Sequence, residues 1–125
     1  MRIAFATTDL AHVNALPLSA PCLVIHEVSE EGAHLIQASE LTTNDREAHL
    51  RLLGGCQFVF AMETDDITSA LLRRLGCDVL LSHRERPIAE GLDNMVSRLR
   101  DQGSRWLRHR EREARQWAIE NPERL

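Results

Sequence analysis

The sequence contains no lysine, only three cysteines and no apolar run long enough to span a bilayer. Three thiols are an odd number and show no paired spacing, which excludes the disulfide framework of a small secreted domain. The N-terminal MRIAFATTD has neither the apolar core nor the cleavage site of a secretory signal. These absences predict a cytoplasmic protein with reduced thiols that does not enter a membrane.

All basic residues are arginine, and their distribution along the chain is uneven. The net charge is −4, with +3 from Arg98 onward and −7 in the preceding residues. Proteins that bind nucleic acids gain affinity by neutralising phosphates. The acidic balance therefore predicts no nucleic-acid partner.

The motifs of nucleophilic catalysis and phosphate binding are also missing. The sequence has no G-x-S-x-G, no G-x-G-x-x-G and no G-x-x-x-x-G-K-[ST]. Asp9, Glu63, Asp65 and Asp66 could hold Mg²⁺ for nuclease chemistry if two strand ends meet. Turns and helix caps account for these acids better. We therefore predict that the protein is not an enzyme, with a metal-dependent nuclease as the minor alternative.

The length of 125 residues fits one domain, and its patterns alternate between strand and helix. Five strands are predicted over residues 3–6, 22–28, 34–41, 56–62 and 78–81. The loop Thr7–Pro21 contains two prolines, Pro17 and Pro21, and so cannot be a helix interior. The predicted class is α/β.

Three helices are predicted between and after these strands. A capping box of Asn44 and Glu47 starts the first helix, and Thr64 or Asp65 caps the second. The inward side of the second helix is predicted to carry Ile67, Leu71, Leu72 and Leu75. The third helix begins at Pro87 and has the clearest apolar stripe, formed by Ile88, Leu92, Met95, Val96 and Leu99.

A fourth helix can begin at Ser104, beyond a boundary at Gly103. It aligns Trp106, Arg110, Glu113 and Trp117 on one line. We predict an α/β domain over residues 1–103 and a helical extension over residues 104–125. The extension either packs its tryptophan face on the domain or binds a partner, since aromatic and arginine side chains are frequent interface anchors.

The element order implies one mixed sheet with helices on its faces and the first strand in a central position. The first strand then lies beside both the second and the fourth. Loops Thr7–Pro21 and Glu63–Asp66 should leave the same edge of the sheet, where ligands of open α/β sheets usually bind. A shared rim is therefore the predicted binding site.

Metal ligands in this region are few. His12 in the long loop and Cys22 at its far end are the candidates, although no metal-finger spacing is present. His26 shares a strand face with Cys22, but apolar residues share that face too, which favours a core or edge histidine.

The other cysteines and histidines considered as ligands are predicted to have structural or surface positions. Cys56 and Cys77 each begin an apolar strand after a glycine and are predicted to be small buried side chains. His34 and His49 are predicted to lie on the surface.

The order of these motifs resembles the dinitrogenase iron–molybdenum cofactor biosynthesis family of the NifX/NafY type, over roughly residues 1–107. The similar segments are MRIAFATTD, HVNA, CLVIHEVS, LLGGCQFVFAM, RRLGCDVLL, PIAEGLDNMVSRL and GSRWL. The resemblance implies a ribonuclease-H-like domain: a mixed five-stranded sheet with helices on both faces, followed here by a C-terminal helix. It also implies a non-catalytic carrier that binds the iron–molybdenum cofactor or an iron–sulfur precursor transiently and passes it to nitrogenase or its assembly proteins.

The chain departs from this family at two places. Leu16-Pro17-Leu18 stands where the family has His-Phe-Gly, so a leucine occupies the position of the expected ligand. Glu63-Thr64-Asp65-Asp66 replaces the family's Ile-Gly-Gly loop, and its acidic side chains repel an anionic cluster.

Two hypotheses follow from the resemblance and these departures. The first is a cofactor carrier whose cofactor-binding residues are Thr8, Asp9, His12, Asn14, Leu16, Cys22, Glu63 and Thr64, with His12 and Cys22 as possible metal ligands. The second is a family member without the ligand site that acts through protein contacts in nitrogenase assembly, using the C-terminal helix.

Overall fold

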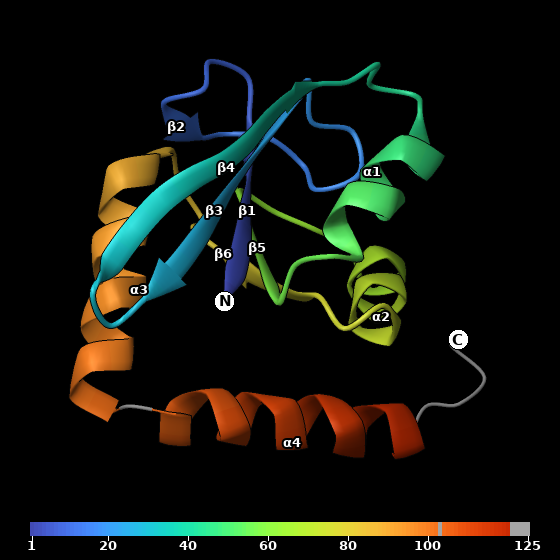
Figure 1. Cartoon of the computed structure of the whole chain (residues 1–125). Coiled ribbons are helices and arrows are strands. Elements are labelled where there is room, and N and C mark those ends of the chain that lie inside the picture. The colour runs from blue at the N-terminus through green and yellow to red at the C-terminus, as the bar shows by residue number, and fades with distance from the viewer. Residues whose placement is uncertain (103, 121–125) are drawn as a thin grey trace.

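The computed structural model describes residues 1–102 and 104–120 of the chain (Figure 1). The strands are β1 (Arg2–Thr7), β2 (His12–Val13), β3 (Cys22–Ser29), β4 (Gly32–Glu40), β5 (Phe58–Ala61), β6 (Asp78–Leu81) and β7 (Arg86–Pro87). The helices are α1 (Arg46–Leu53), α2 (Asp66–Arg74), α3 (Ile88–Gln102) and α4 (Ser104–Glu120). Within this described part, no helix combines the length and apolar character needed to cross a bilayer.

Five strands form a mixed sheet in the order β4-β3-β1-β5-β6. β1 pairs antiparallel with β3 and parallel with β5, and β5 pairs parallel with β6. The central position of β1, between β3 and β5, is confirmed. Since β1 and β5 are parallel, the segments that follow them leave the same edge of the sheet.

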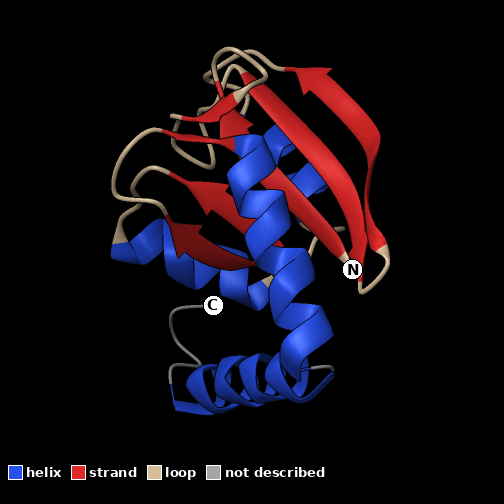
Figure 2. Ribbon diagram, turned by 90° about the vertical axis from the view of Figure 1, so that its left-hand side faces the viewer, coloured by secondary structure: helices blue, strands red, loops and turns tan. Residues whose placement is uncertain are grey.

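Helices cover both faces of this sheet (Figures 1 and 2). On one face, α3 buries Met95 against Phe5 and Phe58. On the other face, Leu53 of α1 and Leu72 of α2 are fully buried in a second cluster. The predicted α/β class and the two covered faces are confirmed, because alternate side chains of β1, β3 and β5 enter opposite clusters, whereas β4 at the sheet edge has no buried side chain.

The long loop after β1 contains an element that the sequence did not predict. Residues His12 and Val13 form β2, which pairs antiparallel with β7 and not with the main sheet. The partner strand includes Pro87, so α3 begins one residue after its predicted start. A two-residue strand is too short to show a period of two.

The cap of α1 is Asp45 and not the predicted Asn44. The carboxylate of Asp45 accepts a hydrogen bond from the backbone N–H of Ala48 at 3.1 Å. Asn and Asp are both good N-cap residues. The expected capping box with Glu47 pointed to Asn44, but the adjacent Asp45 is the cap. The error displaces the start of the helix by one residue.

The predicted inward face of α2 is wrong in part. Ile67 is 76% exposed and Leu75 is 40% exposed, whereas Ala70 and Leu72 are buried. A nine-residue helix has only two and a half turns, so its sequence offers apolar residues on two sides. Packing against the sheet buries the side of α2 that carries Leu72.

Helix α4 lies across the end of the molecule where β5 and β6 begin (Figure 1). Arg110 forms an ion pair with Asp78, and its guanidinium lies 5.8 Å from the ring centre of Phe58. Arg73 of α2 lies over the ring of Trp117 at 5.5 Å. The helix therefore packs on the domain through the predicted Arg110 and Trp117, at the opposite end from the segment that follows β1. The side chain of Trp106, the other predicted tryptophan, lies outside the described part of the structure. Gly103 and residues 121–125 lie outside it as well.

Candidate functional site

The segments after β1 and β5 meet at a shared rim. The backbone N–H of Met62 donates to the carbonyl of Ala15 at 3.1 Å, which joins the end of β5 to the long loop. The predicted meeting of these two loops is confirmed. It follows from the parallel pairing of β1 and β5.

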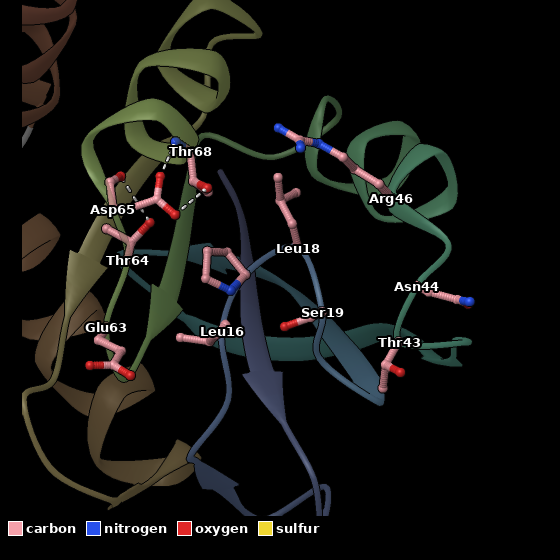
Figure 3. A pocket seen from close by; sticks show the side chains of 11 residues that line it. Leu16, Leu18, Ser19, Thr43, Asn44, Arg46, Glu63, Thr64, Asp65 and Thr68 are labelled. Atoms are coloured by element: carbon pink, nitrogen blue, oxygen red, sulfur yellow. Dashed lines mark hydrogen bonds between the residues drawn. The ribbon is translucent and has the colours of Figure 1, made fainter.

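A cavity of about 470 Å³ opens at this rim (Figure 3). Three segments form it: the second half of the loop after β1, the start of α1, and the turn that leads into α2. Its lining residues are Leu16, Pro17, Leu18, Ser19, Thr43, Asn44, Arg46, Glu63, Thr64, Asp65 and Thr68. Of the predicted site residues, Leu16, Glu63 and Thr64 lie here.

The charged lining residues are Arg46, Glu63 and Asp65. Asp65 caps α2: its carboxylate accepts from the backbone N–H and the hydroxyl of Thr68, at 2.7 and 3.1 Å. These hydrogen bonds, helped by the positive charge of Arg46, lower the pKa of Asp65. The interpretation of Asp65 as a cap is confirmed. The cavity thus contains one cation, two carboxylates, and hydroxyl and amide groups, and none of the described lining residues is a histidine or cysteine.

Asp9 organises the first half of the loop. Its carboxylate accepts from the backbone N–H groups of Ala11 and His12, at 2.9 and 2.8 Å, and from the Thr7 hydroxyl at 3.1 Å. The Nδ1 atom of His12 lies 2.8 Å from the other Asp9 oxygen. The bond from Ala11, then those from His12, hold the pKa of Asp9 far below its usual range. Asp9 is therefore a turn residue, as expected, and its hydrogen bonds favour the ionised form of its carboxylate.

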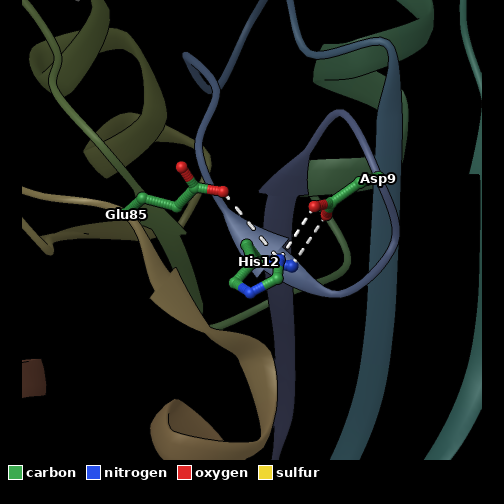
Figure 4. A group of neighbouring side chains, drawn as sticks. All are labelled: Asp9, His12 and Glu85. Atoms are coloured by element: carbon green, nitrogen blue, oxygen red, sulfur yellow. Dashed lines mark hydrogen bonds and ion pairs between the residues drawn. The ribbon is translucent and has the colours of Figure 1, made fainter.

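Glu85 approaches the same imidazole from a distant part of the sequence (Figure 4). Its carboxylate oxygen lies 3.9 Å from His12 Nδ1 and accepts from the amide of Asn14 at 3.3 Å. The sequence analysis did not include Glu85. The available signal was its position after β6, a strand parallel to β1 that ends at the same edge of the sheet.

Two further predicted residues, Thr8 and Asn14, form hydrogen bonds beside Asp9, His12 and Glu85. The side-chain oxygen of Asn14 accepts from the backbone N–H of Thr8 at 2.8 Å, while its amide donates to Glu85. Thr8, Asp9, His12 and Asn14 are thus brought together with Glu85. They lie outside the lining of the 470 Å³ cavity.

Cys22 belongs to neither group. It is 8% exposed at the start of β3, opposite Thr7, and burial raises the pKa of its thiol. A metal ligand must be a thiolate, so this environment does not suit the predicted role. Cys56 and Cys77 are buried core residues, as predicted, and burial raises the pKa of Cys56 to about 11.

Three other histidines had predicted positions: those of His26 and His34 are confirmed, since His34 is exposed on β4, and that of His49 is wrong. His26 packs edge-on against Phe5, with ring centres 5.7 Å apart, in the manner of a core histidine. His49 is fully buried, contrary to the predicted surface position. Its ring nitrogens lie 2.7 Å from the carbonyl of Asp45 and 2.8 Å from that of Ala20. These two carbonyls explain why a polar side chain is stable inside the core.

Comparison with known proteins identifies the fold class. No protein-family model matches the chain, and no curated protein matches it. Five chains of solved structures match, among them the crystal structure of PH0822. That match has 14% sequence identity and a TM-score of 0.62, and it covers 78% of this chain and 90% of that chain. It supports the α/β architecture over most of the chain and, at this identity, the fold alone.

Proposed function

We propose that this protein is an accessory protein of nitrogenase cofactor assembly that carries the iron–molybdenum cofactor or an iron–sulfur precursor. The observation that carries the proposal is the cavity at the joined rim, because the family resemblance implies a cargo site in these same two loops. The order of the resembling motifs along the chain adds support. The proposal places the protein in the cytoplasm, with nitrogenase or its assembly proteins as partners and without catalysis.

The lining chemistry is consistent with weak and reversible holding. Hydroxyl and amide groups of Ser19, Thr43 and Asn44 can donate hydrogen bonds to an anionic cargo, and Arg46 supplies one positive charge. Glu63 weakens the binding of an anionic cargo, because it brings negative charge to the same cavity. A carrier has to release its cargo, so modest affinity suits transfer better than a full ligand set would.

A cavity-filling substitution tests this proposal. Thr43 is exposed and lines the cavity, whereas its neighbour Thr42 is exposed and does not line it. Thr43→Trp should prevent anaerobic co-elution with isolated cofactor, and Thr42→Trp should leave co-elution unchanged. A wild-type protein that never co-elutes with cofactor or precursor would refute the carrier function.

A second candidate function is a protein-interaction module in nitrogenase assembly, without cargo. Two observations favour it: the cavity lining offers no imidazole or thiol, and α4 presents a basic outer surface. Arg105, Arg112 and Arg115 are exposed on the helix face opposite Arg110. This arrangement suits an acidic partner surface.

Reversing these charges tests the second function. The Arg105, Arg112 and Arg115 to Glu triple variant should lose capture of nitrogenase or scaffold proteins while keeping its helical content. A wild-type level of capture by this variant would exclude the outer surface of α4 as the interaction site.

A further inference from the structure

We propose that Asp9, His12 and Glu85 bind one divalent transition-metal ion, at a site separate from the cavity described above. The nearest ligand atoms of these three side chains all lie within 4.8 Å of one another. This is the one group of three such side chains at that spacing within residues 1–102 and 104–120. Figure 4 shows the two carboxylates converging on the same imidazole from opposite sides.

The distances are those of a nearly formed coordination site. Metal–ligand bonds of about 2.1 Å put neighbouring ligand atoms roughly 3.0–3.4 Å apart in octahedral or tetrahedral geometry. His12 Nδ1 lies 2.8 Å from Asp9 and 3.9 Å from Glu85, so the two distances bracket that range. The Glu85 side chain is 54% exposed and can move toward the other two ligands to complete the site.

Backbone contacts hold these groups in place across more than seventy residues of sequence. β2 carries His12 and pairs with β7, which directly follows Glu85. The backbone N–H of Ile88 also donates to the carbonyl of Ala11 at 2.8 Å. Asp9 is fixed by the three hydrogen bonds of its turn, so two of the three ligands are already ordered before an ion binds.

Electrostatics favour a cation at this point. Two carboxylates, those of Asp9 and Glu85, approach one ring nitrogen of His12, at 2.8 and 3.9 Å. Arg86, the neighbouring cation, is engaged by Glu90 at 2.8 Å. An ion in place of the ring proton interacts with both carboxylates at once.

The donor set selects the kind of ion. One imidazole nitrogen and two carboxylate oxygens suit Zn²⁺, Mn²⁺ or Fe²⁺, with water in the open positions. Mg²⁺ and Ca²⁺ prefer sites made of oxygen alone, and a resident iron–sulfur cluster is ligated mainly by cysteine thiolates, which this group does not contain. The site therefore takes a single first-row divalent ion.

The test is titration of the full-length, chelator-treated protein with Zn²⁺ by calorimetry and with Mn²⁺ by electron paramagnetic resonance. We expect one ion per chain, with affinity reduced at least about tenfold by His12→Gln and by Glu85→Gln. The side chains of His12 and Glu85 are 41% and 54% exposed, and glutamine at position 85 can still accept from Asn14. Circular dichroism should show that both variants keep the wild-type fold.

Two matched controls separate this site from general surface binding. His34→Gln and Glu31→Gln alter an exposed histidine and an exposed glutamate elsewhere on the molecule, and the affinity should stay at its wild-type value. Absence of stoichiometric binding by the wild-type protein overturns the proposal, and so does binding that survives both His12→Gln and Glu85→Gln. Because the probe is the metal alone, the result is independent of the cofactor-carrier function.

Discussion

The buried imidazole of His49 provides the sharpest test of how the loop after β1 is held on the domain. Its two ring nitrogens lie within hydrogen-bond distance of the carbonyls of Asp45 and Ala20, and the residue has no exposed surface. The first contact is within the first turn of α1, and the second reaches the loop beside the cavity. His49→Leu removes both polar contacts while keeping an apolar side chain in the core.

The magnitude follows from the two carbonyls. The Asp45 carbonyl keeps the helical hydrogen bond from the backbone N–H of residue 49 at 3.3 Å, whereas the Ala20 carbonyl loses its imidazole partner. A buried carbonyl without a partner costs about 1–3 kcal/mol, and the lost imidazole contact in the helix adds to this. We expect the free energy of unfolding to fall by about 2–3 kcal/mol. For a chain of this length that corresponds to a Tm lower by roughly 6–15 °C.

Urea unfolding followed by circular dichroism measures this change, with the slope m compared between variants to confirm a common unfolded state. His34→Leu is the control, because His34 is exposed on β4 and its replacement should change stability by less than about 0.5 kcal/mol. His49→Gln should recover part of the loss, since its amide can donate to a carbonyl. A His49→Leu variant as stable as His34→Leu would refute the assignment of His49 as a structural link.

Three other measurements address the thiols, the C-terminal helix and the acid response. The three buried cysteines should react slowly with Ellman's reagent at pH 8 in the native protein and rapidly in denaturant. The reason is that a thiol such as Cys56, with a pKa of about 11, is only about one part in a thousand thiolate at that pH. One rapidly reacting thiol per chain in the native state would contradict this. Arg110→Ala removes one arginine that pairs with Asp78, which keeps its contact with Arg73 at 3.4 Å; the change should cost about 1 kcal/mol and speed tryptic cleavage within α4. The exposed Arg112→Ala should do neither, and equal cleavage of the two variants would mean that the ion pair does not hold the helix. The pKa of Asp65 is lowered on folding, so its ionised form stabilises the protein above about pH 4, and that contribution is lost as the pH falls through the lowered value. Asn can still cap the helix but carries no charge, so Asp65→Asn should be less stable than wild type at pH 7 and approach it at pH 3 in urea titrations at both pH values; a pH-independent difference would contradict the stabilising role of the Asp65 charge.

Much of the architecture could be predicted because its signals are local. Five strands, four helices and the central position of β1 follow from apolar runs, caps and the order of elements. The meeting of the two loops followed in turn from the parallel pairing of β1 and β5. Part of the candidate site was therefore accessible from sequence: Asp9 and His12 in one group, and Leu16, Glu63 and Thr64 in the other.

Two of the errors, the inward face of α2 and the position of His49, share one cause. Helical periodicity shows which residues lie on one side of a helix, but the neighbouring elements decide which side is buried, as Ile67 and Leu72 of α2 demonstrate. His49 was placed on the surface because a histidine in an isolated helix has no reason to be buried. Only the Ala20 carbonyl, 29 residues away, provides one.

By itself the sequence determined the α/β class and the central position of β1, since these depend on patterns within one element and on the order of elements along the chain. The tertiary structure excluded Cys22 as a thiolate ligand, because it buries that side chain at the start of β3. Only the tertiary structure decided that Glu85 faces His12 and that the cavity lies apart from them. The pairing of β2 with β7 involves two residues on each side, too few to leave a pattern in the sequence. Contacts of that kind are selected by the whole fold, because their energy is gained only once distant segments have been brought together.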